Sequence, residues 1–271
     1  MLFLYHHDSS VCAAKVRVVL AEKGLSWEGK ILDLDAGDQF EASYLALNPK
    51  AVVPTLVHDG FVVTESNLIV EYLDDAFPSP ALLPDSAAGK FLARTWMKRL
   101  DDGTDGIHWA TTVVTYGAAY RWRLIGKVGS EEPEALERAL ASAMNPASQA
   151  WTRDVVVNGT AASTFKTAIL RLDALLGDFD SALAKSHWLT GDAYGLVDAA
   201  YTSYVARLEF LEFGGMWCNR PHLAAWYKRL KSRSSFSEVA GRYKPQTLQL
   251  LRTRGTESWP SASKLLAGEL R

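Results

Sequence analysis

Residues 50–67 read KAVVPTLVHDGFVVTESN, and this stretch decides the fold of the first part of the chain. Val52–Val57 has the composition of a β-strand. Pro54 inside it must stand at a strand start or in a special turn, because proline cannot donate to a sheet ladder. Asp59-Gly60 is a strong hairpin signal, and the apolar residues after it predict the returning strand. We expect an amphipathic helix from Glu65 to Phe77.

The residues before this stretch supply the remaining elements of one domain. Leu2–Tyr5 is a short β-type run, and helical spacing of apolar residues begins after Ser10. Trp27–Leu34 predicts a second strand, and Phe40–Leu47 predicts a short helix. The expected order over residues 1–80 is therefore β-α-β-α-β-β-α, which is an α/β domain.

The rest of the chain predicts an all-α domain over residues 87–242, after a proline-containing linker. A chain of 271 residues is long enough for two domains. We expect residues 243–271 to form a polar C-terminal extension that wraps the surface or stays loose. The helical patterns cover residues 87–125, 131–152, 163–185, 196–213 and 221–233.

The composition excludes several classes of protein. The formal net charge is −2 at pH 7, whereas a nucleic-acid-binding protein usually has a basic excess. Cys12 and Cys218 are too few for a disulfide framework, so we expect two reduced thiols. The six histidines show no ligand spacing, and no apolar stretch approaches the length of a membrane span. The composition therefore predicts a cytoplasmic protein with no metal site, no nucleic-acid partner and no membrane segment.

The start of the first predicted helix, Ser9-Ser10-Val11-Cys12, is the first candidate for chemistry. A helix N-terminus offers free backbone N–H groups and the positive end of the helix dipole, which stabilise a thiolate and lower the pKa of a thiol. A hydroxyl at this position can also donate a hydrogen bond to a bound thiolate. The structural alternatives are that Ser10 caps the helix and that Cys12 is a small buried side chain.

Two further candidates lie in the opening stretch. A cis Val53-Pro54 bond would present the backbone groups of Val53 to an extended peptide ligand, and the alternative is an ordinary strand start. Glu65-Ser66 indicates an anion site at a helix N-terminus, with a carboxylate that can receive an ammonium group. The alternative is a plain N-cap at Thr64. Gly191–Asp198 predicts a capping box, which is a structural feature.

These features, in this order, resemble the glutathione S-transferase superfamily over about the first 235 residues. The resemblance implies a thioredoxin-like domain followed by an all-helical domain, with glutathione as co-substrate and a symmetric homodimer as the assembly. It implies that Ser10 donates a hydrogen bond to the thiolate and that Cys12 serves any reductive step. The glutathione-binding residues that it implies are Lys50, Val53, Pro54, Glu65 and Ser66.

Within the superfamily, the sequence resembles enzymes that act on aromatic compounds. Three stretches resemble the bacterial tetrachlorohydroquinone reductive dehalogenases: Lys50–Val57, Val113–Gly117 and Ala206–Leu211. The segment from about 126 to 162 resembles an insertion that those enzymes share with bacterial lignin β-etherases. Ser10-Val11-Cys12 also resembles the zeta-type isomerases. One departure is Gly195, where the capping box usually has Ser or Thr, and Gly costs only a few tenths of a kcal/mol there.

The function that this resemblance implies is a transferase whose glutathione thiolate attacks a hydrophobic, aromatic electrophile, by β-aryl ether cleavage or dehalogenation. A zeta-like cis–trans isomerase is one alternative, and a non-catalytic glutathione-binding or partner-binding module is the other. The density of aromatic residues after residue 87 favours an aromatic acceptor. The predicted substrate pocket contains His108, Trp109, Tyr116, Tyr120 and Arg123.

Overall fold

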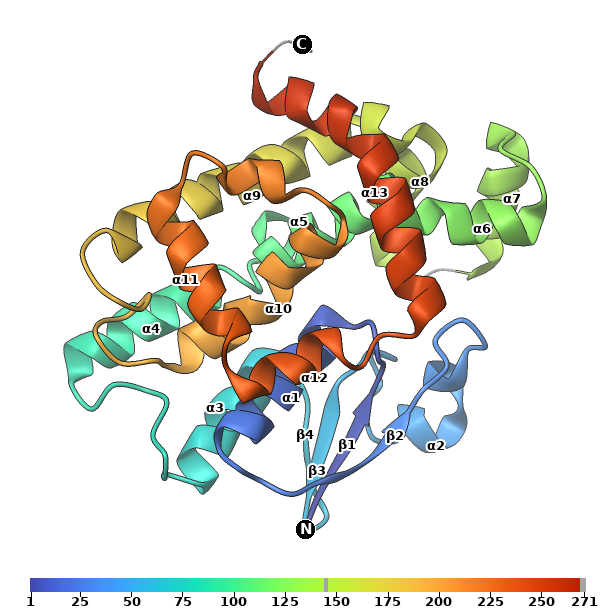
Figure 1. The fold of residues 1–271 in the computed structure, drawn as a ribbon. Coiled ribbons are helices and arrows are strands. Elements are labelled where there is room, and N and C mark those ends of the chain that lie inside the picture. Colours follow the sequence, from blue (N-terminus) through green and yellow to red (C-terminus); the bar gives the residue numbers. More distant parts are fainter. Residues whose placement is uncertain (144–145, 269–271) are drawn as a thin grey trace. The chain divides into compact units, whose positions relative to one another are not determined.

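The computed structural model describes residues 1–143 and 146–268 (Figure 1). Of the predicted segments, residues 144–145 of the helix at 131–152 and residues 269–271 of the extension lie outside the described residues. The chain divides into two compact units, each built from segments far apart in the sequence. Unit 1 comprises Met1–Lys98, Ala182–Ala206 and Ala225–Lys244, and unit 2 comprises Arg99–Ser181, Arg207–Ala224 and Pro245–Arg271.

A four-stranded sheet forms the centre of unit 1. Its strands are β1 (Leu2–His6), β2 (Glu28–Ile31), β3 (Thr55–His58) and β4 (Phe61–Val63). Their order in the sheet is β2-β1-β3-β4. β1 and β2 are parallel, whereas β3 is antiparallel to both β1 and β4. The predicted hairpin at Asp59-Gly60 is therefore confirmed.

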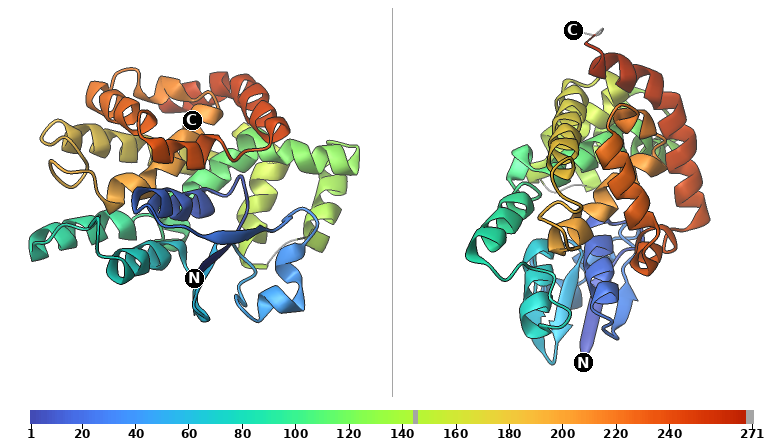
Figure 2. Two further views of the ribbon diagram at one scale, coloured as in Figure 1. Left: turned by 60° about the horizontal axis from the view of Figure 1, so that its bottom comes forward. Right: turned by 60° about the vertical axis from the view of Figure 1, so that its left-hand side comes forward.

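The helices of unit 1 cover both faces of this sheet (Figures 1 and 2). Side chains alternate between the faces along β1. His6 contacts Arg17 of α1, while the Tyr5 ring lies 5.5 Å from the Tyr44 ring of α2, so α1 and α2 lie on opposite faces. The sheet and its helices confirm the predicted β-α-β-α-β-β-α order. The helical elements wholly in unit 1 are α1 (Val11–Glu22), η1 (Asp38–Phe40), α2 (Ala42–Leu45), α3 (Ser66–Ala76), α4 (Ala87–Lys98), η6 (Ser234–Phe236) and α12 (Ser237–Ala240).

The predicted capping box forms at the start of α10 (Leu196–Phe210). Asp198 Oδ2 accepts a hydrogen bond from Gly195 N at 3.1 Å, and Asp198 Oδ1 accepts one from Trp226 Nε1 at 2.7 Å. Burial raises the pKa of Asp198 to about 6, although these hydrogen bonds act in the opposite direction. A Cβ atom at Gly195 would lie 2.9 Å from the carbonyl oxygen of Leu82, so the departure from Ser or Thr there has a packing reason.

Unit 2 is helical throughout the part that the structure describes. Three helices contribute residues to both units: α9 (Ser163–Leu183), α10 and α11 (Pro221–Lys231). The elements wholly in unit 2 are η2 (Gly103–Asp105), α5 (Ile107–Thr115), the π-helical turn η3 (Tyr116–Tyr120), α6 (Arg121–Val128), α7 (Pro133–Ala143), α8 (Pro146–Asn158), η4 (Gly159–Ala161), η5 (Gly214–Trp217) and α13 (Pro245–Leu266).

The single helix expected over residues 87–125 is wrong, because the chain breaks between α4 and α5. Gly103 adopts a positive φ of 58°, which a helix interior does not allow. A Cβ atom at Gly106 would lie 2.8 Å from the carbonyl oxygen of Leu100, so the chain also approaches itself closely there. These two glycines lie inside the expected helix and explain the break.

The segment around residues 126–162 forms a helical hairpin of its own. α7 and α8 lie side by side (Figure 2). Their apolar side chains pack against the end of α6 in a small cluster. The buried members of this cluster are Ile125, Leu136, Leu140 and Val156, with Tyr116 and Trp122 packed against them.

The C-terminal extension is not loose, since most of it forms the long helix α13 (Figure 1). Leu251, Gly255 and Ala262 belong to its buried stripe. A Cβ atom at Gly255 would lie 2.0 Å from the carbonyl oxygen of Leu211, so the two backbones are in direct contact. The sequence did not predict this buried stripe, because the segment is polar in composition and has Pro260 inside the helix.

Candidate functional site

Ser10 is the N-cap of α1, as one of the two sequence alternatives predicts. Its backbone is extended, with φ of −77° and ψ of 122°, and its Oγ accepts a hydrogen bond from Ala13 N at 3.2 Å. Capping in this way uses a lone pair of the hydroxyl oxygen, so the hydroxyl hydrogen stays available for another acceptor. Capping and donation to a ligand are therefore compatible roles for the same side chain.

Cys12, two residues further along the chain in α1, is buried rather than presented at the surface. Only 9% of its surface is exposed, and its Sγ lies 3.6 Å from the hydroxyl of Tyr204 on α10. The neighbouring Ser203 donates a hydrogen bond to the Val11 carbonyl at 2.9 Å, which fixes this contact between α1 and α10. The structure thus agrees with the sequence alternative of a buried cysteine, which a substrate reaches less easily than Ser10.

The loop before α1 is held by a buried arginine that the sequence analysis missed. Arg17 donates hydrogen bonds to the carbonyl oxygens of His7 and Asp8, each at 3.2 Å, and to that of Glu238. Burial lowers the pKa of Arg17 to about 10. Burial, and then the charge of Arg17, lower the pKa of His6 to about 4, so His6 is neutral at pH 7. The signal in the sequence was a charged residue within the apolar spacing of α1.

The Val53-Pro54 peptide bond is cis, as the sequence analysis suggested. The turn before it is fixed by polar side chains. Tyr44 donates a hydrogen bond to the Val52 carbonyl at 2.6 Å, and Asn48 donates one to the same oxygen at 3.0 Å. The backbone N–H and C=O of Val53 have no hydrogen-bond partner among the described residues. They are therefore available to an extended ligand.

The start of α3 has an unusual backbone. Glu65 is the N-cap of this helix, so the alternative of Thr64 as N-cap is wrong. Glu65 adopts φ of 67° and ψ of 108° and makes no side-chain cap, while Ser66, the first helical residue, is buried. A positive φ is costly for a residue that has a Cβ atom. The Glu65 carboxylate lies 2.6 Å from Lys50 Nζ, and both side chains face solvent.

The sheet brings the start of α1, the cis-proline turn and the start of α3 to one edge, namely the side of the sheet where β1 and β4 end and β3 begins. Tyr5, near the end of β1, pairs with Thr55 at the start of β3, so the loop that leads to Ser10 lies beside the cis-proline turn. Leu56 pairs with Val63 at the end of β4, which places the start of α3 at the same edge. The antiparallel register therefore gathers segments that are about 55 residues apart in the sequence.

The comparisons with known proteins agree with this arrangement. Residues 9–76 match the family model of the glutathione S-transferase N-terminal domain, and residues 133–229 match that of the C-terminal domain. The tetrachloro-p-hydroquinone reductive dehalogenase of Sphingobium chlorophenolicum is 31% identical over 238 residues, which cover 86% of this chain and 93% of that protein. The chain belongs to the glutathione S-transferase family.

Two other relatives of this transferase cover almost its whole length. Glutathione S-transferase GstB of Escherichia coli K12 is 29% identical over 241 residues, which are 88% of this chain and 97% of that protein. Protein LigF of Sphingobium sp. SYK-6 is 28% identical over 91% of this chain and 96% of its own length. The crystal structure of the β-etherase LigF superimposes with a TM-score of 0.74 and 25% identity, covering 89% of this chain and 99% of that one.

The residues predicted for the transferase's substrate pocket all lie in unit 2, and some of them contact one another. The rings of Tyr116 and Tyr120 have their centres 5.7 Å apart. Trp109 lines a cavity with Trp151, whereas Tyr116 packs against the apolar cluster of α6, α7 and α8. The guanidinium carbon of Arg123 lies 4.1 Å from the centre of the Tyr120 ring. His108 is in the first turn of α5.

A second arginine that the sequence analysis missed, Arg207, lies beside the pair formed by Arg123 and Tyr120. Arg207 is buried, and its guanidinium carbon lies 5.5 Å from the Tyr120 ring. Arg207 also donates a hydrogen bond to Thr115 at 3.2 Å, and Arg123 donates one to Thr247 at 3.0 Å. The Tyr120 ring therefore contacts two guanidinium groups.

Two other kinds of site are absent from the described part of the transferase. Residues 1–143 and 146–268 contain no cluster of three or more His, Cys, Asp or Glu side chains that could hold a metal ion. Within the same ranges, no helix is both long enough and apolar enough to cross a membrane.

Proposed function

We propose that this transferase binds glutathione at the edge of the sheet and activates its thiol for attack on an aromatic electrophile. The observation that carries the proposal is the meeting of Ser10, the Val53-Pro54 turn and Glu65-Ser66 at that one edge. Capped by Ser10, the start of α1 offers a hydroxyl hydrogen and the positive end of a helix dipole. A thiolate placed there is stabilised, which makes it a good nucleophile at neutral pH.

In this proposal, each polar group at the edge of the sheet binds a different part of glutathione. The free N–H and C=O of Val53, next to Pro54, pair with its cysteinyl backbone. Glu65 receives the ammonium group of the γ-glutamyl end, and Ser66 at the start of α3 binds the carboxylate beside it. Lys50 leaves its ion pair with Glu65 to reach the glycine carboxylate, which is an inexpensive exchange because both side chains are exposed.

Ser10 and Cys12 have different roles in the proposal. Ser10 donates its hydroxyl hydrogen to the glutathione thiolate. In a simple transfer, the sulfur forms a bond to carbon while a phenolate or a halide leaves. Cys12 would act in a reductive cycle, in which its thiolate attacks the sulfur of a glutathionyl-aromatic intermediate. The sulfur–carbon bond breaks, the ring carbon takes the electron pair and a proton, and a second glutathione reduces the mixed disulfide left between Cys12 and glutathione. Its burial against Tyr204 favours Ser10 as the group that meets the sulfur first.

The relatives supply the proposed reaction type. One is named for the reductive dehalogenation of tetrachloro-p-hydroquinone, and LigF is titled a β-etherase. We therefore propose β-aryl ether cleavage or dehalogenation. We expect the aromatic substrate to contact residues predicted from the sequence, namely His108, Trp109, Tyr116, Tyr120 and Arg123.

A panel assay tests the reaction type. The purified protein is incubated with glutathione and, separately, a β-aryl ether, a chlorinated hydroquinone and a maleyl compound, and the products are followed by chromatography. Glutathione-dependent release of phenol or chloride supports the proposal. Turnover of the maleyl compound alone would instead identify the zeta-like isomerase that the Ser10-Val11-Cys12 pattern suggests. Binding of glutathione without any turnover would identify a non-catalytic module.

We also propose a cytoplasmic homodimer. Unit 1 exposes several large apolar side chains, among them Phe61 of β4, Leu68 of α3 and Phe91 of α4. Exposed apolar surface of this kind is typical of a protein–protein interface. Light scattering of the wild type should report twice the mass of 29.8 kDa, and Phe91→Asp should shift the equilibrium towards the monomer. A wild type with the mass of one chain would contradict the dimer.

A further inference from the structure

Unit 2 contains a cavity of about 350 Å³ that opens to the surface. This volume is within the range of small-molecule pockets, about 300–1,000 Å³. None of the residues proposed to bind glutathione lines it. The lining residues are Thr104, Trp109, Ala150, Trp151, Ser163, Thr164 and Thr167.

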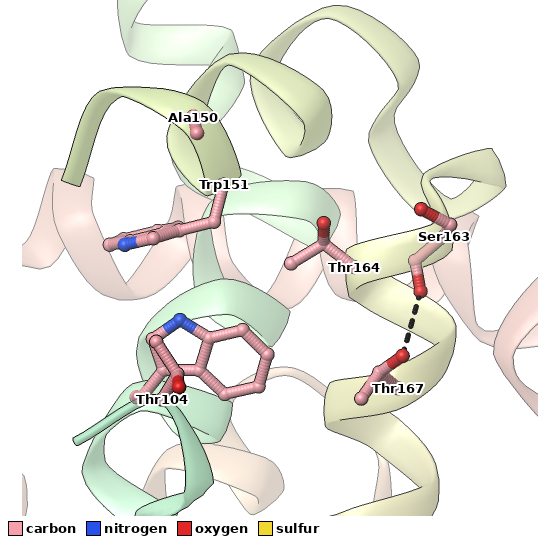
Figure 3. Close-up of a pocket in the computed structure, with 7 residues that line it drawn as sticks. Thr104, Ala150, Trp151, Ser163, Thr164 and Thr167 are labelled. Carbon is pink, nitrogen blue, oxygen red and sulfur yellow. Dashed lines mark hydrogen bonds between the residues drawn. The ribbon is translucent and has the colours of Figure 1, made fainter. Parts of the chain in front are cut away.

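Two indole rings in the cavity wall are held in place by their neighbours. The guanidinium carbon of Arg171 lies 5.3 Å from the centre of the Trp109 ring, and Arg171 donates a hydrogen bond to the carbonyl of Thr104. The rings of Trp151 and Tyr116 pack edge to face, with ring centres 6.4 Å apart and an interplanar angle of 82°. Figure 3 shows the Trp151 indole reaching from α8 over the side of the cavity where Thr104 lies. Rings fixed in this way lose little entropy when a planar ligand binds.

The side of the cavity formed by α9 is rich in hydroxyl groups. Ser163 and Thr164 donate hydrogen bonds to the Asp154 carboxylate. Thr167 donates one to the Ser163 carbonyl at 3.1 Å, drawn as a dashed line in Figure 3. The hydrogens of these hydroxyls are thus already used, while their oxygens keep lone pairs that can accept. This side of the cavity therefore suits a ligand that donates a hydrogen bond.

The charges near the cavity do not favour an anionic ligand. The cation in its wall, Arg171, is already paired with a carboxylate, since its Nη2 lies 2.8 Å from Asp105 Oδ1. Burial acts to raise the pKa of Asp154, but the hydrogen bonds from Thr164, Asn158 and Ser163 outweigh it and lower the pKa. Asp154 is therefore ionised at neutral pH and repels a carboxylate or a phenolate. In addition, the Trp109 Nε1–H is buried without a hydrogen-bond partner among the described residues, and a ligand oxygen that reached it would satisfy this donor.

We propose that this cavity binds a neutral, planar aromatic compound that carries a phenolic hydroxyl. The ring packs against the indoles of Trp109 and Trp151, and the hydroxyl donates to the oxygens of Ser163, Thr164 or Thr167. This binding does not depend on glutathione or on the proposed thiol chemistry.

Fluorine NMR titrations of the full chain test the proposal, with 4-fluorophenol as the ligand and 4-fluoroanisole as its matched partner that cannot donate a hydrogen bond. We expect 4-fluorophenol to bind the wild type. We expect 4-fluoroanisole to bind about fivefold more weakly, which corresponds to the loss of one neutral hydrogen bond. Trp151→Ala should weaken 4-fluorophenol binding about tenfold, through the loss of an aromatic contact.

Three further variants serve as controls. Trp217→Ala removes another partly exposed tryptophan of unit 2 that does not line the cavity, and it should change the affinity by less than about twofold. Trp151→Phe keeps an aromatic wall and should retain most of the affinity even if Trp151→Ala fails to fold. Ser10→Ala should leave 4-fluorophenol binding unchanged, which separates this proposal from that of the thiol site.

Three results would each overturn the proposal. The first is no binding of 4-fluorophenol by the wild type. The second concerns Trp151. It is an affinity for 4-fluorophenol that is equal in the wild type and in a folded Trp151→Ala variant, or an affinity of Trp151→Phe that is about tenfold weaker than that of the wild type. The third is an equal loss in the Trp217→Ala control.

Discussion

The two helix starts that meet at the edge of the sheet are built in opposite ways. At α1, Ser10 has an ordinary extended backbone and its hydroxyl caps the helix. At α3, Glu65 has a positive φ, no side-chain cap and a carboxylate that faces solvent beside Lys50. The stability of the fold accounts for the first arrangement but not for the second. An unfavourable backbone conformation that adds nothing to stability indicates a requirement of function. The start of α3 is therefore stronger evidence for a bound ligand than the start of α1.

The largest effect that we expect concerns the α1 start. Ser10→Ala should lower kcat/KM about 100-fold or more, because removing one hydrogen-bond donor to a reacting anion costs about that much. Ser10→Thr keeps the hydroxyl and should retain most of the activity. Steady-state kinetics and the ultraviolet absorbance of the bound thiolate measure the effect. Unchanged thiolate formation in Ser10→Ala would show that Ser10 is only a cap.

The second prediction concerns the support beneath the same helix start. The folded-state pKa of His6 is lowered to about 4 from 6.5, by burial and then by Arg17. Between these pH values the unfolded chain binds the additional proton, so stability falls as pH drops from 6.5 towards 4, by up to about 3 kcal/mol.

His6→Gln should flatten this dependence, and thermal melts of both proteins across the pH range measure it. The raised pKa of Asp198 changes the pH dependence of stability in the opposite direction in part of this range. Because both proteins contain Asp198, its effect cancels when they are compared. Parallel pH curves for the two proteins would rule out His6 as the source.

The third prediction concerns the α3 start. Glu65→Ala should weaken the binding of S-methylglutathione about 30-fold, because a hydrogen bond to a charged group contributes about 1.5–3 kcal/mol. Lys50→Ala is the matched control on the other side of the ion pair, and it should retain tighter binding than Glu65→Ala. Isothermal titration calorimetry measures both. Equal affinities for Glu65→Ala and the wild type would remove the ammonium role from Glu65.

The smallest effects concern stability and separate the two helix starts most directly. Glu65→Gly should raise the free energy of unfolding by about 1 kcal/mol, because glycine tolerates a positive φ, while it should weaken glutathione binding about as much as Glu65→Ala does. Ser10→Ala should lower the free energy of unfolding by about 1 kcal/mol, whereas Ser10→Gly should lower it by only a few tenths. Urea unfolding measures all three. A destabilised Glu65→Gly variant would contradict the functional explanation of the α3 backbone.

The α/β part of the fold could be predicted from the sequence because its signals are local. Asp59-Gly60 set the hairpin, and the proline in Val53-Pro54 restricted where a strand could begin. The same is true of the Asp198 capping box, whose two ends are three residues apart. The family resemblance then joined these separate features in the correct order.

The parts that could not be predicted depend on contacts between distant residues. The Cys12 contact with Tyr204 joins positions 192 residues apart, and no local pattern decides whether a thiol faces outwards or inwards. The spacing of aromatic residues after residue 87 predicted one pocket with both Trp109 and Tyr120, whereas Trp109 lines the cavity with Trp151 and the Tyr120 ring packs against two arginines, Arg123 and Arg207. Trp151, which completes the cavity around Trp109, lies on α8, the second helix of the hairpin that begins with α7.

The backbone contact at Gly255 has a consequence for the register of α13. The position that touches Leu211 has room for a hydrogen atom only. A shift of the helix by about one turn would bring Leu251 or Trp259 to that position, and neither side chain fits there. Gly255 therefore fixes where α13 sits along unit 2, so a single-residue insertion or deletion between Pro245 and Gly255 should be far more disruptive than one after Leu266.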